Sequence, residues 1–236
     1  NIVFGPARSD FPTFKVLCKL GQFLGMEDLC ITDIPFKVQS RNMTGQFTMH
    51  IMASFILGLM IAFPYVAWEI WRFIKPGLQV KERKYSRGAV AAISILFFFG
   101  VMFGYYVITP WMVYFLANYS ISDMVVNEFD ITSYVSTVVM LVFGSGLLFQ
   151  LPVVIYFLTK IGIVTPEFLR KYRKHSIIII LIVAAIVTPP DPLSQMLITI
   201  PLYLLFEISI LISASVAKRK AKEEAEELLR EQSLPS

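Results

Sequence analysis

Five long apolar stretches, joined by short charged or proline-containing connections, constrain the fold of this chain more than any other feature. About 20 apolar residues wound as a helix cross the ~30 Å hydrocarbon core of a bilayer. Only 16% of the residues are charged, whereas a typical soluble domain has about 25%. We therefore expect an all-α, polytopic membrane helix bundle with five visible spans. The apolar stretches cover residues 43–71, 89–116, 133–159, 176–189 and 193–217.

The last two of these spans are expected to be short. The runs 176–189 and 193–206 hold about 14 residues each, so each helix reaches roughly 21 Å. Either Glu207, which follows the second run, extends its carboxylate to the membrane surface, or the bilayer thins around this hairpin. Ordinary helices with extra residues at their ends are the alternative.

Lysine and arginine are concentrated in alternate connections, which predicts the orientation of the chain. Cytoplasmic loops carry an excess of these residues, and the connection 117–132 has neither of them. We therefore expect the N-terminal residues to lie outside and the C-terminus to lie in the cytoplasm. One further span before this sequence would give six, with both ends inside. The cationic connections are residues 72–87, 160–175 and 218–230.

The chain divides into an extracytoplasmic loop segment (1–42), a transmembrane bundle (43–217) and a charged cytoplasmic tail (218–236) whose composition favours a helix. Its two cysteines, Cys18 and Cys30, both fall in the outer segment. Because that side is oxidising and a closed loop stabilises a small segment, we predict a disulfide between them. Two buried thiols are the alternative.

The sequence shows no pattern typical of catalysis, of a metal or cofactor site, or of nucleic-acid binding. It has two histidines and no glycine-rich phosphate loop. A small-solute transporter or channel is the main alternative class. Such proteins often show internal repeats or ionisable groups at mid-membrane, and this sequence shows neither. An intramembrane hydrolase would need a nucleophile such as Ser145. Its neighbours Gly144 and Gly146 instead favour a close-packed helix face of small residues.

Five ordered blocks of residues resemble the TatC family of twin-arginine translocase proteins over about residues 43–217. Members of that family have six spans with both ends in the cytoplasm, so this chain is similar to one that lacks its first helix. The blocks are WRFIKPGL at 71–78 with Glu82 and Arg83, FQLP at 149–152, GIVTPEFLR at 162–170, TPPD at 188–191 with Ser194 and Gln195, and IPLYLLFEI at 200–208.

This resemblance implies the core subunit of a protein translocase in the inner (cytoplasmic) membrane. Such a subunit recognises twin-arginine signal peptides and exports folded proteins, driven by the proton-motive force. The implied partners are single-span TatA- and TatB-type subunits, the lipid bilayer and further copies of the chain in a complex. The family has no catalytic residues and no cofactor.

The resemblance also implies a signal-peptide site in the first cationic connection. The Glu82 carboxylate would accept an arginine guanidinium, whose planar fork matches it bidentately. A locally paired surface carboxylate, worth little, is the alternative. Phe73 matches the key aromatic residue of that connection, or it anchors the helix end at the membrane surface. The predicted site residues are Glu82, Phe73, Pro76, Leu78 and Arg83.

Two further sets of polar residues match family positions. Gln150 lies inside the third predicted span, where most of the family carries a glutamate. Its neutral amide would bond to a partner or signal peptide, or simply to a neighbouring helix. The turn between the last two spans would dock the transmembrane helix of a partner, or its polar groups would cap the last helix. The residues of that turn are Thr188, Asp191, Ser194 and Gln195.

Overall fold

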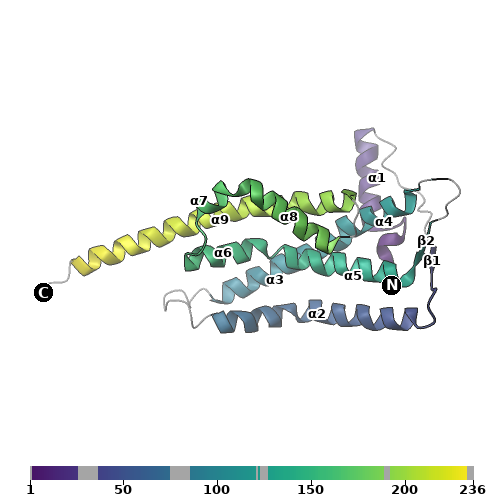
Figure 1. The fold of residues 1–236 in the computed structure, drawn as a ribbon, viewed down its shortest axis with the longest axis horizontal. Helices are drawn as coiled ribbons and strands as arrows, with labels where there is room; N and C mark the ends of the chain where they lie inside the picture. The colour runs from purple at the N-terminus through teal and green to yellow at the C-terminus, as the bar shows by residue number, and fades with distance from the viewer. Residues whose placement is uncertain are drawn as a thin grey trace.

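The computed structural model describes residues 2–25, 37–74, 86–120, 122, 127–188 and 192–232, which form an elongated helix bundle (Figure 1). The outer segment holds a 3-10 turn η1 (Gly5–Ala7), helix α1 (Pro12–Leu24) and strand β1 (Lys37–Gln39). The first part of the bundle comprises α2 (Gly45–Ile74), α3 (Ser86–Phe103), a π-helical turn η5 (Gly104–Ile108) and α4 (Thr109–Asn118).

The second part begins with a strand, β2 (Glu128–Asp130), that pairs in parallel with β1. Helices α5 (Ile131–Leu148) and α6 (Leu151–Ile161) follow, then the short α7 (Pro166–Lys171). The last two helices are α8 (Arg173–Val187) and α9 (Pro192–Gln232). Three-residue strands were not expected from the sequence, because so short a run shows no readable alternation.

The predicted membrane helix bundle is confirmed, with differences in the number and length of its spans. Among the described residues, four segments are long and apolar enough to cross a bilayer: Gly45–Phe73, Val90–Asn118, Ile131–Ile161 and Ser194–Lys222. Helix α8 has 15 residues and is short, as expected. Helix α9 has 41 residues and is not short, because it continues without a break into the charged tail. The alternative of extra residues at the helix end therefore describes α9.

Close packing of α3 against α5 depends on glycines. A Cβ atom at Gly100 would lie 2.7 Å from the Ser145 carbonyl oxygen, and one at Gly104 would lie 2.9 Å from the Ser145 side chain. On α5, Gly146 faces Phe97 of α3, and Gly144 faces α8. The glycine–serine–glycine run is therefore close-packed, as predicted, but it packs against two helices, α3 and α8, and not along a single face.

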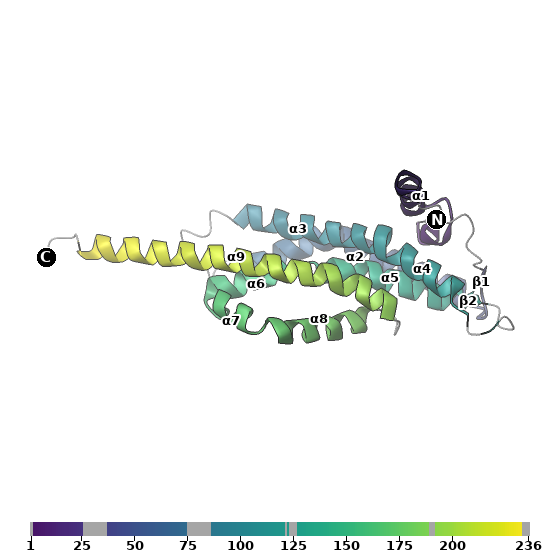
Figure 2. The ribbon, with the colours of Figure 1, turned by 90° about the horizontal axis from the view of Figure 1, so that it is seen from above.

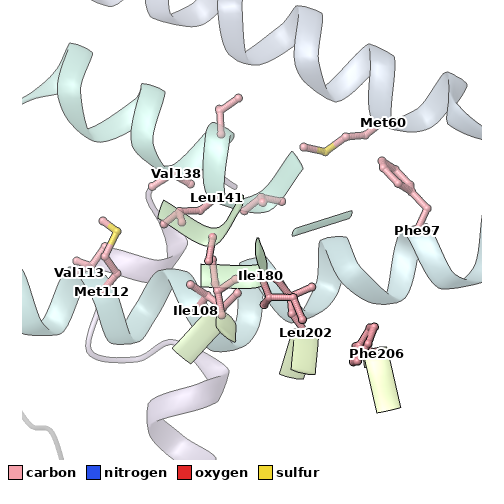
Figure 3. Close-up of a cluster of buried hydrophobic side chains, with 14 of the residues drawn as sticks. Met60, Phe97, Ile108, Met112, Val113, Val138, Leu141, Ile180, Leu202 and Phe206 are labelled. Carbon is pink, nitrogen blue, oxygen red and sulfur yellow. The ribbon is translucent and has the colours of Figure 1, made fainter. Parts of the chain in front are cut away.

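The core lies where α3, α5, α8 and α9 meet (Figure 3). Phe97, Leu141 and Ile108 are fully buried there, and Leu202 reaches the same cluster from α9. Helix α2 packs on the edge of this cluster through Met60. The bundle is therefore centred on α5, with α2 at its side (Figure 1).

Candidate functional site

The two ends of the bundle differ in charge and in structure. Figure 1 shows the outer segment with β1 and β2 at one end, and the end of α2, the α6–α7 turn and the extension of α9 at the other. The described cations of the three cationic connections belong to this second end. Those whose side chains are described are Arg72, Lys160, Arg170, Lys171, Arg173, Lys174, Lys218, Arg219, Lys220 and Lys222.

At this cationic end, α2 stops with one aromatic side chain held and another free of the bundle. Trp71 is buried and its ring lies 4.9 Å from that of Phe157 in α6. Phe73, two residues later, is 85% exposed. Arg72 lies 3.8 Å from Glu69 in a half-exposed ion pair. Phe73 is thus presented beside the predicted signal-peptide connection, and it does not pack into the bundle. The other predicted residues of that site, Pro76, Leu78, Glu82 and Arg83, lie outside the described residues.

Gln150 occupies a break between α5 and α6 and not the interior of one continuous helix. Pro152 has no N–H for the α-helical ladder, and the backbone turns so that the Gln150 N–H donates to Leu147. The Gln150 Nε2 donates to the Ile93 carbonyl of α3 at 3.2 Å. Its Oε1 is buried and has no hydrogen-bond partner among the described residues. The amide therefore links two helices and keeps one acceptor open.

The polar residues of the α8–α9 hairpin make hydrogen bonds within the chain. Thr188 is buried and its hydroxyl donates to the Ala184 carbonyl of its own helix. The Gln195 Nε2 donates to the Leu181 carbonyl, which ties α9 to α8. Ser194 is buried in the first turn of α9. The Gln195 amide therefore holds the two helices of the hairpin together, and Asp191 lies outside the described residues.

The exposed surface of the hairpin is apolar. Met196 and Ile200 on α9 are 61% and 62% exposed, and Ile186 on α8 is similarly open. Of the predicted docking residues, Thr188 and Ser194 are buried and Gln195 is partly buried, so the exposed side chains described on this hairpin are other residues.

A polar cluster that the sequence did not reveal joins the start of α8 to α9. The Arg173 Nη2 donates to Glu207 Oε2 at 2.9 Å, and the Tyr203 hydroxyl donates to Glu207 Oε1 at 3.0 Å. Both carboxylate oxygens of Glu207 therefore accept hydrogen bonds from side chains of the protein. A charge within a span usually has a partner, and Tyr203 stands one helical turn before Glu207. Arg173 is 34 residues away, so spacing alone could not identify it.

The structure also describes the surroundings of Ser145, the nucleophile that an intramembrane hydrolase would need. The Ser145 hydroxyl is buried and donates to the Leu141 carbonyl at 2.6 Å, so it is engaged with its own helix. Within the described part of the chain, no three His, Cys, Asp or Glu side chains gather as metal ligands would.

Cys18 is disulfide-bonded. Its predicted partner, Cys30, lies outside the described residues, so the pairing stays a prediction.

Comparison with known sequences gives a consistent set of similar proteins. The family model described as "Sec-independent protein translocase protein (TatC)" matches residues 4–201. The TatC protein of Blattabacterium sp. subsp. Periplaneta americana (strain BPLAN) is 40% identical over 221 residues, which cover 93% of this chain and 83% of the relative. TatCy of Bacillus subtilis (strain 168) is 40% identical over 185 residues, 78% of this chain and 72% of the relative.

Comparison with solved structures agrees. A crystal structure described as "Twin Arginine Translocase Receptor- TatC" superposes with a TM-score of 0.69 and 29% identity, covering 91% of this chain and 92% of that one. A second, of the same receptor in DDM, gives the same TM-score at 27% identity.

Proposed function

The chain belongs to the TatC family of Sec-independent protein translocase proteins, and from that premise we propose that it is the core subunit of a twin-arginine translocase. It recognises twin-arginine signal peptides and, with TatA- and TatB-type single-span partners, exports folded proteins using the proton-motive force. It acts as a receptor and scaffold and not as an enzyme. The observation that carries this proposal is the structural likeness to a twin-arginine translocase receptor over nine-tenths of both chains.

The signal-peptide site lies at the cationic end of α2. Phe73 supports this position, because its exposed ring stands at the end of the rigid helix that Trp71 anchors. Glu82 supplies the carboxylate for an arginine of the peptide, and Pro76, Leu78 and Arg83 shape the connection around it. A charged pair lost from a partly desolvated groove costs about 2–5 kcal/mol, which would reduce peptide binding at least tenfold.

Photo-crosslinking of a twin-arginine peptide to membranes that carry Glu82→Gln tests this site. Glu69→Gln is the matched control, because Glu69 is a half-exposed carboxylate near the same helix end and lies 3.8 Å from Arg72. We expect the first variant to lose crosslinking and the second to keep it. Equal crosslinking of both variants at equal protein levels would exclude Glu82 from the site.

Gln150 contributes a second contact, inside the membrane. Its Oε1 is buried and open, so a donor on a signal peptide or partner helix would satisfy it. Gln150→Leu should lower export of a folded reporter about tenfold, since an unmade buried hydrogen bond costs about 1–3 kcal/mol. Gln150→Glu should be accepted. Unchanged export in Gln150→Leu would mean that the amide contacts no peptide or partner and serves only in its hydrogen bond to the Ile93 carbonyl.

The α8–α9 hairpin docks the transmembrane helix of a TatA- or TatB-type partner. Thr188, Asp191, Ser194 and Gln195 are the predicted polar residues, and the Gln195 bond to α8 stiffens the hairpin that carries them. A photo-crosslinking amino acid at position 196 should capture the partner. The same probe at position 198 is the control, because Ile198 is 2% exposed. Capture at neither position in an active complex would place the partner elsewhere.

The distribution of positive charge between the two ends of the bundle predicts the orientation of the chain. The chain is a multi-pass membrane protein, and its cationic end faces the cytoplasm of a cell whose inner membrane it spans. A protease-sensitive tag after residue 236 would be cleaved only from the cytoplasmic side.

We do not favour a small-solute transporter, because the similar proteins are named as protein translocases.

A further inference from the structure

Helix α1 lies across the bundle and not along it. Figure 1 shows it standing at a steep angle to the bundle axis and extending past the bundle's side, and Figure 2 views it nearly end-on. In both views it stands at the level where α9 begins. The candidate membrane span of α9 begins at Ser194, so we place the membrane surface beside α1 at that level.

The first turns of α1 are fixed to the α3–α4 rod. Phe14 is 2% exposed and its ring lies 6.4 Å from that of Tyr114. The Thr13 hydroxyl donates to the Tyr106 carbonyl, to which Pro110 has no N–H to offer. Phe11, the residue that caps the helix start, stacks on Tyr106 with ring centroids 5.5 Å apart. The direction of α1 is therefore set by packing at its beginning.

The rest of α1 presents an apolar side chain at each end of an open face. Val16 is 57% exposed and Phe23 is 87% exposed. Seven residues separate them, two helical turns or about 10 Å, so both point to the same side of the helix. Lys15, Lys19 and Gln22 are exposed beside this face.

Three faces can thus be distinguished on one helix of 13 residues. One packs on the protein, one is apolar and open, and one is polar with two lysines. An open apolar face flanked by cations is typical of a helix that lies in the plane of a membrane surface. Tyr106, which stacks on Phe11, and Trp111, five residues later in the chain, are of the types that gather at membrane–water boundaries.

We propose that α1 is a membrane-surface helix. Its Val16–Phe23 face enters the boundary between headgroups and acyl chains in the leaflet at the β1–β2 end, and Lys15 and Lys19 lie beside the lipid phosphates. The occupant of the open face is therefore phospholipid. This inference requires only that the chain spans a bilayer, so it stands or falls separately from the proposed translocase function.

Fluorescence quenching in lipid nanodiscs tests the proposal. A fluorescent amino acid is introduced at position 23 or, as the matched control, at position 22, whose glutamine is exposed on the polar face. The nanodiscs contain phospholipid brominated near the top of its acyl chains. We expect at least twofold stronger quenching at position 23 than at position 22. Equal quenching at both positions, or none at position 23, would overturn the proposal.

A second measurement uses the unsubstituted chain, in case the probe disturbs folding. Phospholipid with a diazirine high on its acyl chain is photolysed in the same nanodiscs, and labelled residues are located by peptide mass spectrometry. Label on Val16 and Phe23, with little on Lys15, Lys19 and Gln22, is the expected result. An unlabelled α1 would show that its open face faces water or awaits a protein partner, and would contradict the proposal.

Discussion

Helices α2 and α5 are both apolar enough to cross a membrane, yet their surroundings differ. In the most apolar 18 residues of the span that contains α5, 56% of the residues are buried inside the structure, whereas only 11% are buried in the corresponding 18 residues of α2. Figure 1 shows α5 in the middle of the bundle and α2 along its side. In a bilayer, lipid tails solvate an apolar helix as well as other helices do. Apolar character therefore shows that a helix spans the membrane, and does not show where it lies within the protein.

Small residues mark the difference better than apolar ones. Helix α5 carries Gly144, Ser145 and Gly146 where its neighbours approach closely. Helix α2 carries Gly58, near which no other atom would contact a Cβ. Close approach between helices replaces the hydrophobic effect as the source of association in a membrane, so the role of each glycine has to be judged from its neighbours.

Truncating a large side chain should separate the two helices most strongly. Leu141 on α5 is fully buried, and Leu141→Ala should lower the free energy of unfolding by about 2–5 kcal/mol. Ile61 on α2 is 75% exposed to the surroundings. Lipid refills the space at that position, so Ile61→Ala should change stability by about 0.5 kcal/mol or less. Unfolding in mixed micelles titrated with SDS measures both, and equal losses would refute the difference.

Adding a single methyl group should give a smaller difference between the helices, with a change of sign. Gly100→Ala places a Cβ 2.7 Å from the Ser145 carbonyl, and forcing the two backbones apart should cost about 1–3 kcal/mol. Gly58→Ala meets nothing and gains up to about 1 kcal/mol of helix propensity. The same SDS titration applies. A stabilising Gly100→Ala would mean that α3 moves freely against α5.

Much of the bundle could be predicted from the sequence because it depends on long patterns. Stretches of membrane length identify helices, and the small-residue run correctly predicted close packing on α5. The helical character of the charged tail was also predictable, although its continuity with the last span was not. Nothing in residues 206–218 breaks a helix, and only the cost of Glu207 in lipid suggested an earlier end to the span.

The contacts that position polar groups could not be predicted, because they join residues distant in sequence. Arg173 meets Glu207 across 34 residues, and Gln150 meets Ile93 across 57. The Gln39 side chain donates to Glu128 across 89 residues. The family resemblance indicated Gln150 and Glu207 as notable residues, but their partners required the packed helices.

Helix α9 is intermediate between α2 and α5, with 33% of its most apolar 18 residues buried, and hydrogen bonds to polar side chains stabilise its position. Glu207→Gln removes the negative charge that pairs with Arg173, in a site where both side chains are partly exposed. Because hydrogen bonds to charged groups contribute about 1.5–3 kcal/mol and exposure weakens this one, we expect a loss near 1–2 kcal/mol. A double-mutant cycle with Arg173→Gln, scored by the SDS titration, isolates the pair. Additive losses would show that the two side chains do not act together.

The smallest expected effect comes from a pair of serines on α9 that differ only in their partners. Ser209 and Ser213 are both fully buried, one helical turn apart. The Ser213 hydroxyl lies 2.8 Å from that of Thr159 on α6, whereas the Ser209 hydroxyl donates to Leu205 on its own helix. Hydrogen bonds between membrane helices contribute about 0.6 kcal/mol on average. Ser213→Ala should therefore cost about that much more than Ser209→Ala in the SDS titration, and Thr159→Val should remove the excess. If the two alanine variants unfold alike, α6 and α9 are held by shape alone, as α3 and α5 are at Gly100.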